Sequence, residues 1–144
     1  MSIYAYTTNA GGSTVTKINL STFLTVGSAL AVGSGPQSIA IDPTGTYAYT
    51  ANYSANSVTK INLSTFTAVN SATVGSGPCS ITIDPTGTYA YVANESGSTI
   101  TKINLSTFLT VGSALAVGSH PCSIACDRAS VNNGSFLALM GASM

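Results

Sequence analysis

The sequence predicts an all-β protein that is built from a repeated unit. The segment SIAIDPTGTYAYTAN at residues 38–52 returns as SITIDPTGTYAYVAN at residues 80–94. Residues 16–34 and 101–119 are identical, and equivalent positions of the repeats are 42 or 43 residues apart. Apolar residues alternate with small or polar ones on either side of the DPTG motif, which is the pattern of half-buried strands. No stretch combines a helical period with capping residues.

Each period contains four short extended segments. In the complete copy they span about residues 38–41, 46–52, 57–63 and 71–74. A repeat of this length with four strands is typical of one blade of a β-propeller. The alternation is imperfect, as we expect for a blade, because both of its faces pack against neighbouring blades. The sequence therefore predicts a β-propeller of four-stranded antiparallel blades.

The DPTG motif predicts a tight turn between the first two strands of a blade. Asp42 can accept hydrogen bonds from the backbone that follows it, Pro43 fixes its own φ, and Gly45 closes a type I turn. Asp84 and Asp127 occupy the equivalent positions. A ring of carboxylates around a cation is the alternative for these three aspartates. The Pro-Thr-Gly that follows two of them favours the turn.

The composition indicates a folded domain with few charges. Of the 144 residues, 44% are hydrophobic and 6% are charged, and the formal net charge is zero. The chain is long enough to bury a core, and a surface without net charge favours self-association. The four basic residues are too few for a nucleic-acid interface; they are Lys17, Lys60, Lys102 and Arg128. No apolar run reaches the roughly 18 residues of a membrane span.

Compartment and redox state follow from the first residues and the cysteines. The sequence opens without the charged leader and apolar segment of a signal peptide. A complete chain is therefore expected in the cytoplasm, and a fragment of an exported protein at the cell surface or outside the cell. Cys79, Cys122 and Cys126 are an odd number without metal-type spacing, so we expect no disulfide framework. Cys126 replaces Ile41 and Ile83 of the other repeats and is expected to be a small buried residue.

Three segments resemble the Tyr-Val-Thr-Asn signature of the YVTN β-propeller repeats, namely IYAYTTN, TYAYTAN and TYAYVAN. DPTG and VGSGP stand where that family has its turn and its blade boundary. The resemblance covers about residues 2–127, so we expect propeller repeats over residues 1–127 and a non-repeat tail over residues 128–144. It implies a binding or structural role, as in archaeal surface-layer proteins and periplasmic propellers. The alternative is an enzyme, because some similar propellers are lactonases or metal-assisted lyases.

The repeats predict three blades per chain, divided unevenly. With the strands of one period labelled A to D, the chain contains B-C-D, A-B-C-D, A-B-C-D and a last A. Three blades are too few to close a ring, and an unpaired strand edge at each end favours association. We expect a six-bladed homodimer in which the last strand A of each chain completes the first blade of the other; an open filament is the alternative. The expected interface consists of Ile3, Tyr4, Ala5 and Tyr6 on one edge and Ser123, Ile124, Ala125 and Cys126 on the other.

The innermost strands predict a polar rim around the propeller axis, where many propellers bind ligands. By this analogy of fold, the rim consists of Gln37, Ser38, Cys79, Ser80, His120, Cys122 and Ser123. His120 with two cysteines is a candidate zinc or copper site. Cys79 and Cys122 occupy equivalent positions in separate blades, however, which places them too far apart to share a metal or a disulfide. We expect no metal, no cofactor and no catalytic residue.

The tyrosines form a further recurring set. They lie at period two in every repeat, at Tyr4, Tyr6, Tyr47, Tyr49, Tyr89 and Tyr91. A sugar-binding stripe is one interpretation. Packing between blades is the interpretation that their recurrence in each blade favours.

Overall fold

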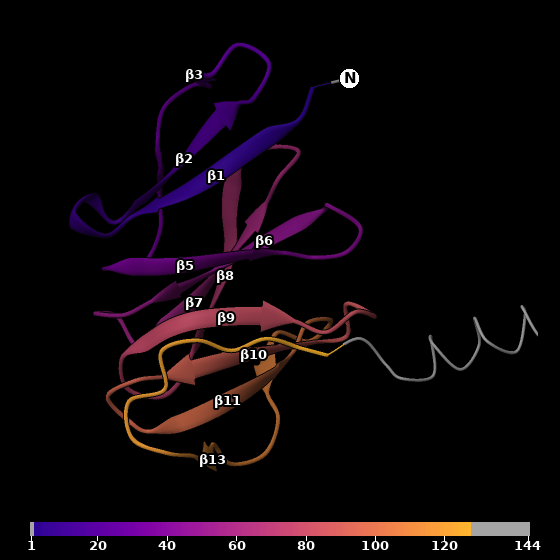
Figure 1. Cartoon of the computed structure of the whole chain (residues 1–144). Helices are drawn as coiled ribbons and strands as arrows, with labels where there is room; N and C mark the ends of the chain where they lie inside the picture. The colour runs from indigo at the N-terminus through magenta and orange to yellow at the C-terminus, as the bar shows by residue number, and fades with distance from the viewer. Residues whose placement is uncertain (1, 128–144) are drawn as a thin grey trace, which may run out of the picture.

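The computed structural model describes residues 2–127, which form three antiparallel sheets in succession along the chain (Figure 1). The first sheet, blade 1, contains β1 (Tyr4–Asn9), β2 (Thr14–Asn19), β3 (Leu24–Thr25) and β4 (Leu30–Ala31). Blade 2 contains β5 (Pro36–Ile41), β6 (Tyr47–Asn52), β7 (Ser57–Asn62) and β8 (Thr67–Thr73). Blade 3 contains β9 (Pro78–Ile83), β10 (Tyr89–Asn94), β11 (Thr99–Asn104), β12 (Leu109–Thr110) and β13 (Leu115–Ala116). Among these residues the one helical element is a single 3-10 turn, Ala10–Gly12.

The predicted β-propeller fold is confirmed, with three blades in the described part of the chain. In blade 2 each strand pairs with the next along the chain, in the order β5-β6-β7-β8. The inner strands β5 and β9 of neighbouring blades lie beside each other, and β5 also lies beside β1 (Figure 1). Blade 1 begins with β1, which is equivalent to β6 and β10, so within residues 2–127 this blade has no inner strand.

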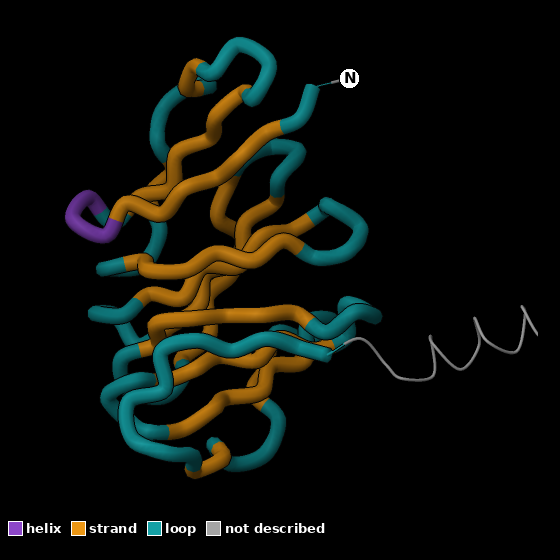
Figure 2. The backbone as a smooth tube through the Cα atoms, viewed as in Figure 1, coloured by secondary structure: helices purple, strands orange, loops and turns teal. Residues whose placement is uncertain are grey.

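The outer strands differ from the prediction. A single outer strand was expected in each blade, at about residues 71–74 in blade 2. In the structure the outer strand of blade 2, β8, is longer and begins at Thr67. Blades 1 and 3 each have two short pieces instead, separated by a loop (Figure 2). The loops contain Gly27 and Gly112, both with φ of +66°. Residues with this left-handed φ interrupt a strand, and blade 2 has no glycine at this place.

The DPTG turns are confirmed in the two blades that contain them. The backbone N–H of Gly45 donates to the carbonyl of Asp42 at 3.0 Å, and the Asp42 carboxylate accepts from the N–H of Thr46 at 2.9 Å. Asp84 makes the same bonds to Gly87 and Thr88, at 3.0 and 2.8 Å. Asp42 and Asp84 are therefore turn residues, as predicted.

An asparagine at the end of the second strand holds each blade together. Asn52 is fully buried, and its Nδ2 donates to Ser57 Oγ at 3.1 Å and to Thr59 Oγ1 at 2.9 Å on β7. Its Oδ1 accepts from Thr50 Oγ1 at 2.9 Å. These bonds fix β6 to β7 from within the sheet, where an unpaired amide would be costly.

The hydrophobic core lies between the blades. We call the face of a blade that meets the preceding blade its leading face, and the opposite one its trailing face. At the first junction Phe66 of blade 2 packs on Tyr6 of blade 1, with ring centroids 5.8 Å apart. At the second junction Phe108 of blade 3 packs on Tyr49 of blade 2, again at 5.8 Å. Each leading face therefore supplies a phenylalanine to a tyrosine of the blade before it.

The predicted packing between blades holds for Tyr6 and Tyr49, whereas Tyr91 belongs to neither core cluster. The first tyrosine of each pair makes a different contact. Lys60 Nζ lies 4.2 Å from the centroid of the Tyr47 ring. Lys17 over Tyr4 and Lys102 over Tyr89 repeat this cation–π contact at 4.1 Å. The lysines of the repeat thus cover tyrosine rings near the turn side of each blade.

Candidate assembly faces and axial rim

The leading face of blade 1 is open. Phe23 occupies the position of Phe66 and Phe108, and it is 79% exposed because no blade formed by residues 2–127 lies against this face. Leu20 is exposed on the same face, whereas its equivalents Leu63 and Leu105 are buried. An apolar face of this kind, built to pack on a blade, is a candidate interaction site.

The trailing face of blade 3 is open as well. Leu115 is 65% exposed, while its equivalent in blade 1, Leu30, packs into the core between blades 1 and 2. Within residues 2–127 no phenylalanine ring packs on Tyr91, although Tyr6 and Tyr49 each have one. The two ends of the chain thus expose opposite faces.

The inner edge of blade 1 is unpaired on one side. β1 pairs only with β2, whereas β6 and β10 pair with a strand on both sides. Asn9 on β1 bonds Thr14 and Thr16 of β2 as Asn52 bonds β7. Asn52 is also covered by the connection between blades, since a Cβ at Gly33 would lie 2.5 Å from its Nδ2. No described residue covers Asn9 in this way, and Asn9 is half-buried.

The last repeat segment, residues 121–127, provides the corresponding unpaired edge. It follows blade 3 and forms no strand in the structure (Figure 2). Its start is attached to the inner strand of blade 3, since Cys79 Sγ donates to the Pro121 carbonyl at 3.1 Å. Gly118, the equivalent of Gly33, has no atom within 4 Å of where a Cβ would stand. The expected burial of Cys126 is not observed. This residue is half-exposed, because no described strand pairs with its segment.

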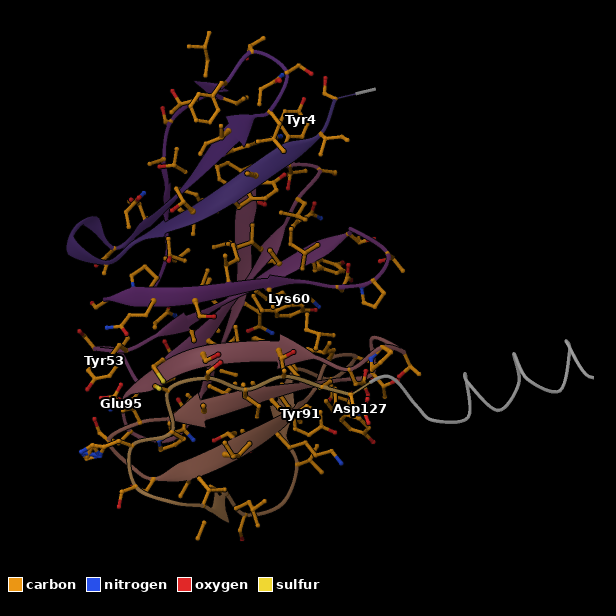
Figure 3. The ribbon with its side chains drawn as sticks, viewed as in Figure 1. Tyr4, Tyr53, Lys60, Tyr91, Glu95 and Asp127 are labelled. Atoms are coloured by element: carbon orange, nitrogen blue, oxygen red, sulfur yellow. The ribbon has the colours of Figure 1, made fainter. Side chains whose placement is uncertain are left out.

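The expected interface residues are accessible on both edges. On the first edge Ile3 is 66% exposed, and Tyr4, Ala5 and Tyr6 are half-buried. On the second edge the exposed residues are Ser123 and Ala125, and the half-buried ones are Ile124 and Cys126. Figure 3 shows Tyr4 on blade 1 and Asp127 near Tyr91 of blade 3. The two edges of one molecule therefore do not meet.

A hollow of about 640 Å³ marks the place of the missing strand and turn of blade 1. It is lined by residues of blades 1 and 2, including Tyr4, Lys17, Ile41 and Gly45. Between blades 2 and 3 the equivalent turns touch, with Pro43 Cδ 3.1 Å from where a Cβ at Gly87 would stand. Nothing lies within 4 Å of the same point at Gly45. Among residues 2–127, no turn therefore occupies the place beside Gly45 that Pro43 occupies beside Gly87.

The predicted rim residues lie near the starts of the inner strands β5 and β9 and in the segment that follows blade 3. Gln37, Cys122 and Ser123 are exposed, and Ser80 is half-buried. Ser38 is occupied structurally, because its Oγ accepts from the N–H of Ile81 on the neighbouring inner strand at 3.2 Å. Cys79 donates to the Pro121 carbonyl, as described above. Of the seven rim residues, Ser38 thus joins two inner strands and Cys79 joins an inner strand to the last repeat segment.

The ionisable groups of the rim do not converge on a metal site. Within residues 2–127 no three His, Cys, Asp or Glu side chains lie together in the manner of metal ligands, and all three cysteines are free thiols. His120 is exposed. Burial, followed by the nearby Glu95 carboxylate, raises the pKa of the Cys79 thiol. This thiol is therefore less reactive than an ordinary exposed cysteine.

Among residues 2–127, the one side chain with a strongly shifted pKa is a core residue, Tyr49. Burial, with smaller contributions from Asp42 and Tyr47, raises the pKa of Tyr49 to about 12. This shift follows from the packing of Tyr49 between blades 2 and 3. It does not indicate a catalytic group, because the ring lies under Phe108.

Comparisons with known proteins support the fold. No protein-family model and no curated sequence matches the chain. Among solved structures it is similar to hydrazine synthase of Kuenenia stuttgartiensis, with a TM-score of 0.78 and 25% identity over 83% of this chain. It is also similar to a candidate 6-phosphogluconolactonase from Bacteroides fragilis, with a TM-score of 0.68 and 22% identity over 83% of this chain. A functionally unknown protein from Desulfotomaculum acetoxidans matches with a TM-score of 0.61 and 21% identity over 78% of this chain.

The chain is much shorter than these propeller-like proteins. It covers 34%, 37% and 39% of the three structures, and so spans little more than a third of their length. In the described residues no helix has the length and apolar character that a membrane crossing requires. The predicted tail at residues 128–144 lies outside the described residues.

The sequence prediction missed the residues that form the two open faces. Phe23, Leu20 and Leu115 were not among the expected interface residues, which included only the strand edges. The signal was present in the repeat, because equivalent positions in an internal blade are buried. A comparison of blade positions at the two ends of the chain would have found them.

Proposed function

We propose that the protein is a non-enzymatic β-propeller scaffold that completes its ring with a second copy of itself. The observation that carries this proposal is the pair of open blade faces. The leading face of blade 1 and the trailing face of blade 3 have the residues that pack on each other at both internal junctions. Stacking a second copy by the same rule places Phe23 of one chain on Tyr91 of the other.

The same rule gives the strand pairing at the new junction. In blade 2, Ser38 pairs with Ala51 and Ile41 with Ala48. Shifting these pairs by whole repeats places Ser123 opposite Thr8 of the second copy. Residues 123–126 then form the missing inner strand of blade 1. Main-chain bonds of this kind are a common means of association through an unpaired strand edge.

Two copies suffice to close the ring. Three blades from each chain give six, which lies within the four to eight blades of typical propellers, whereas three copies would give nine. The two junctions would be identical and related by a two-fold axis. The resemblance to YVTN repeats supports a structural or binding role for such a ring at a surface. Its inner rim would carry the exposed Gln37, Cys122 and Ser123 from both copies.

Light scattering after size exclusion at low micromolar concentration tests this proposal. We expect a mass of twice 14.4 kDa. A mass of one subunit would overturn it, and a mass that grows steadily with concentration would indicate an open filament. A lactone hydrolysis assay on the same material tests the non-enzymatic part. We expect no turnover above that of the buffer.

A further inference from the structure

One position of the connection between blades departs from the repeat at the C-terminal end of the chain. The connections into blades 2 and 3 end in Gly35-Pro36 and Gly77-Pro78, whereas the last one ends in His120-Pro121. Gly35 and Gly77 have φ of +66° and +65°, and His120 has φ of +56°. The backbone is therefore the same in all three connections. The last one adds an imidazole in a left-handed conformation that favours glycine.

The internal connections require glycine for a second reason, which is lack of space. A Cβ at Gly35 would lie 2.6 Å from Ser54 Oγ, and a Cβ at Gly77 would lie 2.4 Å from Ser96 Oγ. The backbone fixes this approach, since the N–H of Tyr53 donates to the Gly35 carbonyl and that of Glu95 to the Gly77 carbonyl, both at 2.8 Å. A histidine would clash with the serine at either internal junction.

The opposite departure occurs at the N-terminal end of the chain. In the loop after β1, the residue equivalent to Ser54 and Ser96 is Gly11. Nothing lies within 4 Å of where a Cβ at Gly11 would stand. Blade 1 therefore has a vacant position where the other blades have a serine hydroxyl. The histidine at one end of the chain and the vacancy at the other end are complementary.

We infer that His120 of one copy packs over Gly11 of a second copy and so specifies which blades may join. This inference rests on the proposed ring, whose junction brings these two residues together by the repeat rule. The contact would be made at the blade junction between two chains, with the Ala10 N–H donating to the His120 carbonyl. At an internal junction the serine excludes His120, so the pair directs the end of one chain to the start of another.

Glu95 is placed to complete this contact. Its equivalent in blade 2, Tyr53, reaches Ser96 of the next blade with its Oη 3.0 Å from Ser96 Oγ. At the new junction Glu95 replaces that tyrosine, and Gly11 of the second copy replaces that serine. The Glu95 carboxylate therefore faces the same vacancy as His120, and can accept a hydrogen bond from the imidazole N–H.

Two substitutions at the vacancy test the inference. Gly11→Ser restores the serine of the internal blades, and we expect the dimer to dissociate about ten- to a hundredfold more readily, as is usual for overpacking. The double variant Gly11→Ser with His120→Gly recreates an internal junction, and we expect it to dimerise again. Gly12→Ser is the matched control, because it adds the same side chain at the next exposed residue. The dissociation constant is measured by sedimentation, and circular dichroism verifies that each variant is folded.

The outcomes separate this inference from the proposed ring. A wild-type monomer would refute the ring itself. A dimeric wild type with a Gly11→Ser variant that is equally tight would refute only the His120–Gly11 contact. Failure of the double variant to recover would also refute it, since the serine would then act by another route.

Discussion

Two identical segments of the chain have opposite surroundings. Residues 16–34 and 101–119 have the same sequence, yet Phe23 is 79% exposed and Phe108 is 4% exposed. The difference lies in the neighbour, because Phe108 packs on Tyr49 of blade 2 and no blade precedes Phe23. Local sequence thus determines the strand and the direction of each side chain. The adjacent blade determines whether that side chain is buried.

The same two segments show the converse on their trailing faces. Leu30 packs into the core between blades 1 and 2, and its equivalent Leu115 is exposed. Phe23 and Leu115 are thus exposed at positions whose equivalents in the other copy, Phe108 and Leu30, pack into a core. A second molecule that supplies the missing neighbours would therefore cover both exposed sets at once.

Replacing the two phenylalanines separately gives the largest expected effect. Phe108→Ala should lower the free energy of unfolding by about 3–5 kcal/mol, because it removes a buried ring from the core. Phe23→Ala should change the unfolding of the dissociated chain by less than about 0.5 kcal/mol, as for most surface positions. Urea unfolding at nanomolar and at high micromolar concentration measures both.

The concentration dependence identifies the neighbour of Phe23. In the proposed dimer, Phe23→Ala should lower stability at high concentration only, because only there is the ring covered by a second copy. Equal losses for Phe23→Ala and Phe108→Ala at nanomolar concentration would contradict the comparison. Phe66→Ala serves as the control for an internal junction, since Phe66 packs on Tyr6 within one chain.

The sequence predicted the features that depend on local chemistry. The four-strand unit and the turn at Asp42 follow from alternation and from the hydrogen bonds of an aspartate, which need no distant partner. The break in the outer strand of blade 1 was not predicted, because it depends on the positive φ of a single residue, Gly27. The exposure of Phe23 could not follow from a residue pattern that is identical around Phe108. It depends on which blades are present.

The asparagines give a second, smaller test of the same comparison. Asn52→Ala should cost about 1–3 kcal/mol, because it leaves the buried Thr50 hydroxyl without a partner and removes one of the two hydrogen bonds that the Thr59 hydroxyl accepts. Asn9→Ala should cost about 1 kcal/mol or less in the dissociated chain, since water reaches the half-buried Thr14 and Thr16. The measurement is again urea unfolding at two concentrations. A larger loss for Asn9→Ala than for Asn52→Ala would show that blade 1 is already closed within one chain.

The smallest expected effect on the stability of the subunit is that of a cysteine introduced at the edge of blade 1. In blade 2 the pair of Ile41 and Ala48 is directly opposed, and shifting it by whole repeats places Cys126 opposite Ala5 of a second copy. The next pair along, Asp42 with Tyr47, is hydrogen-bonded. Because the two types of pair alternate, Ile41 with Ala48 is a non-hydrogen-bonded pair, in which the side chains lie closer together. Ala5→Cys should leave the stability of the chain within about 0.5 kcal/mol of the wild type. It should form an intermolecular disulfide with Cys126 when glutathione disulfide is added.

The matched control for this disulfide is Thr7→Cys. The same shift places Thr7 opposite Ile124, which has no thiol, so a cysteine there should remain reduced under the same conditions. Non-reducing electrophoresis should show a covalent dimer for Ala5→Cys and a single chain for Thr7→Cys and for Ala5→Cys with Cys126→Ser. Equal cross-linking of both single variants would contradict the register, because it would mean that the edge of β1 meets thiols at random. Cross-linking of Ala5→Cys alone would place the last strand of one chain against the first strand of another, which is the neighbour that Phe23 lacks.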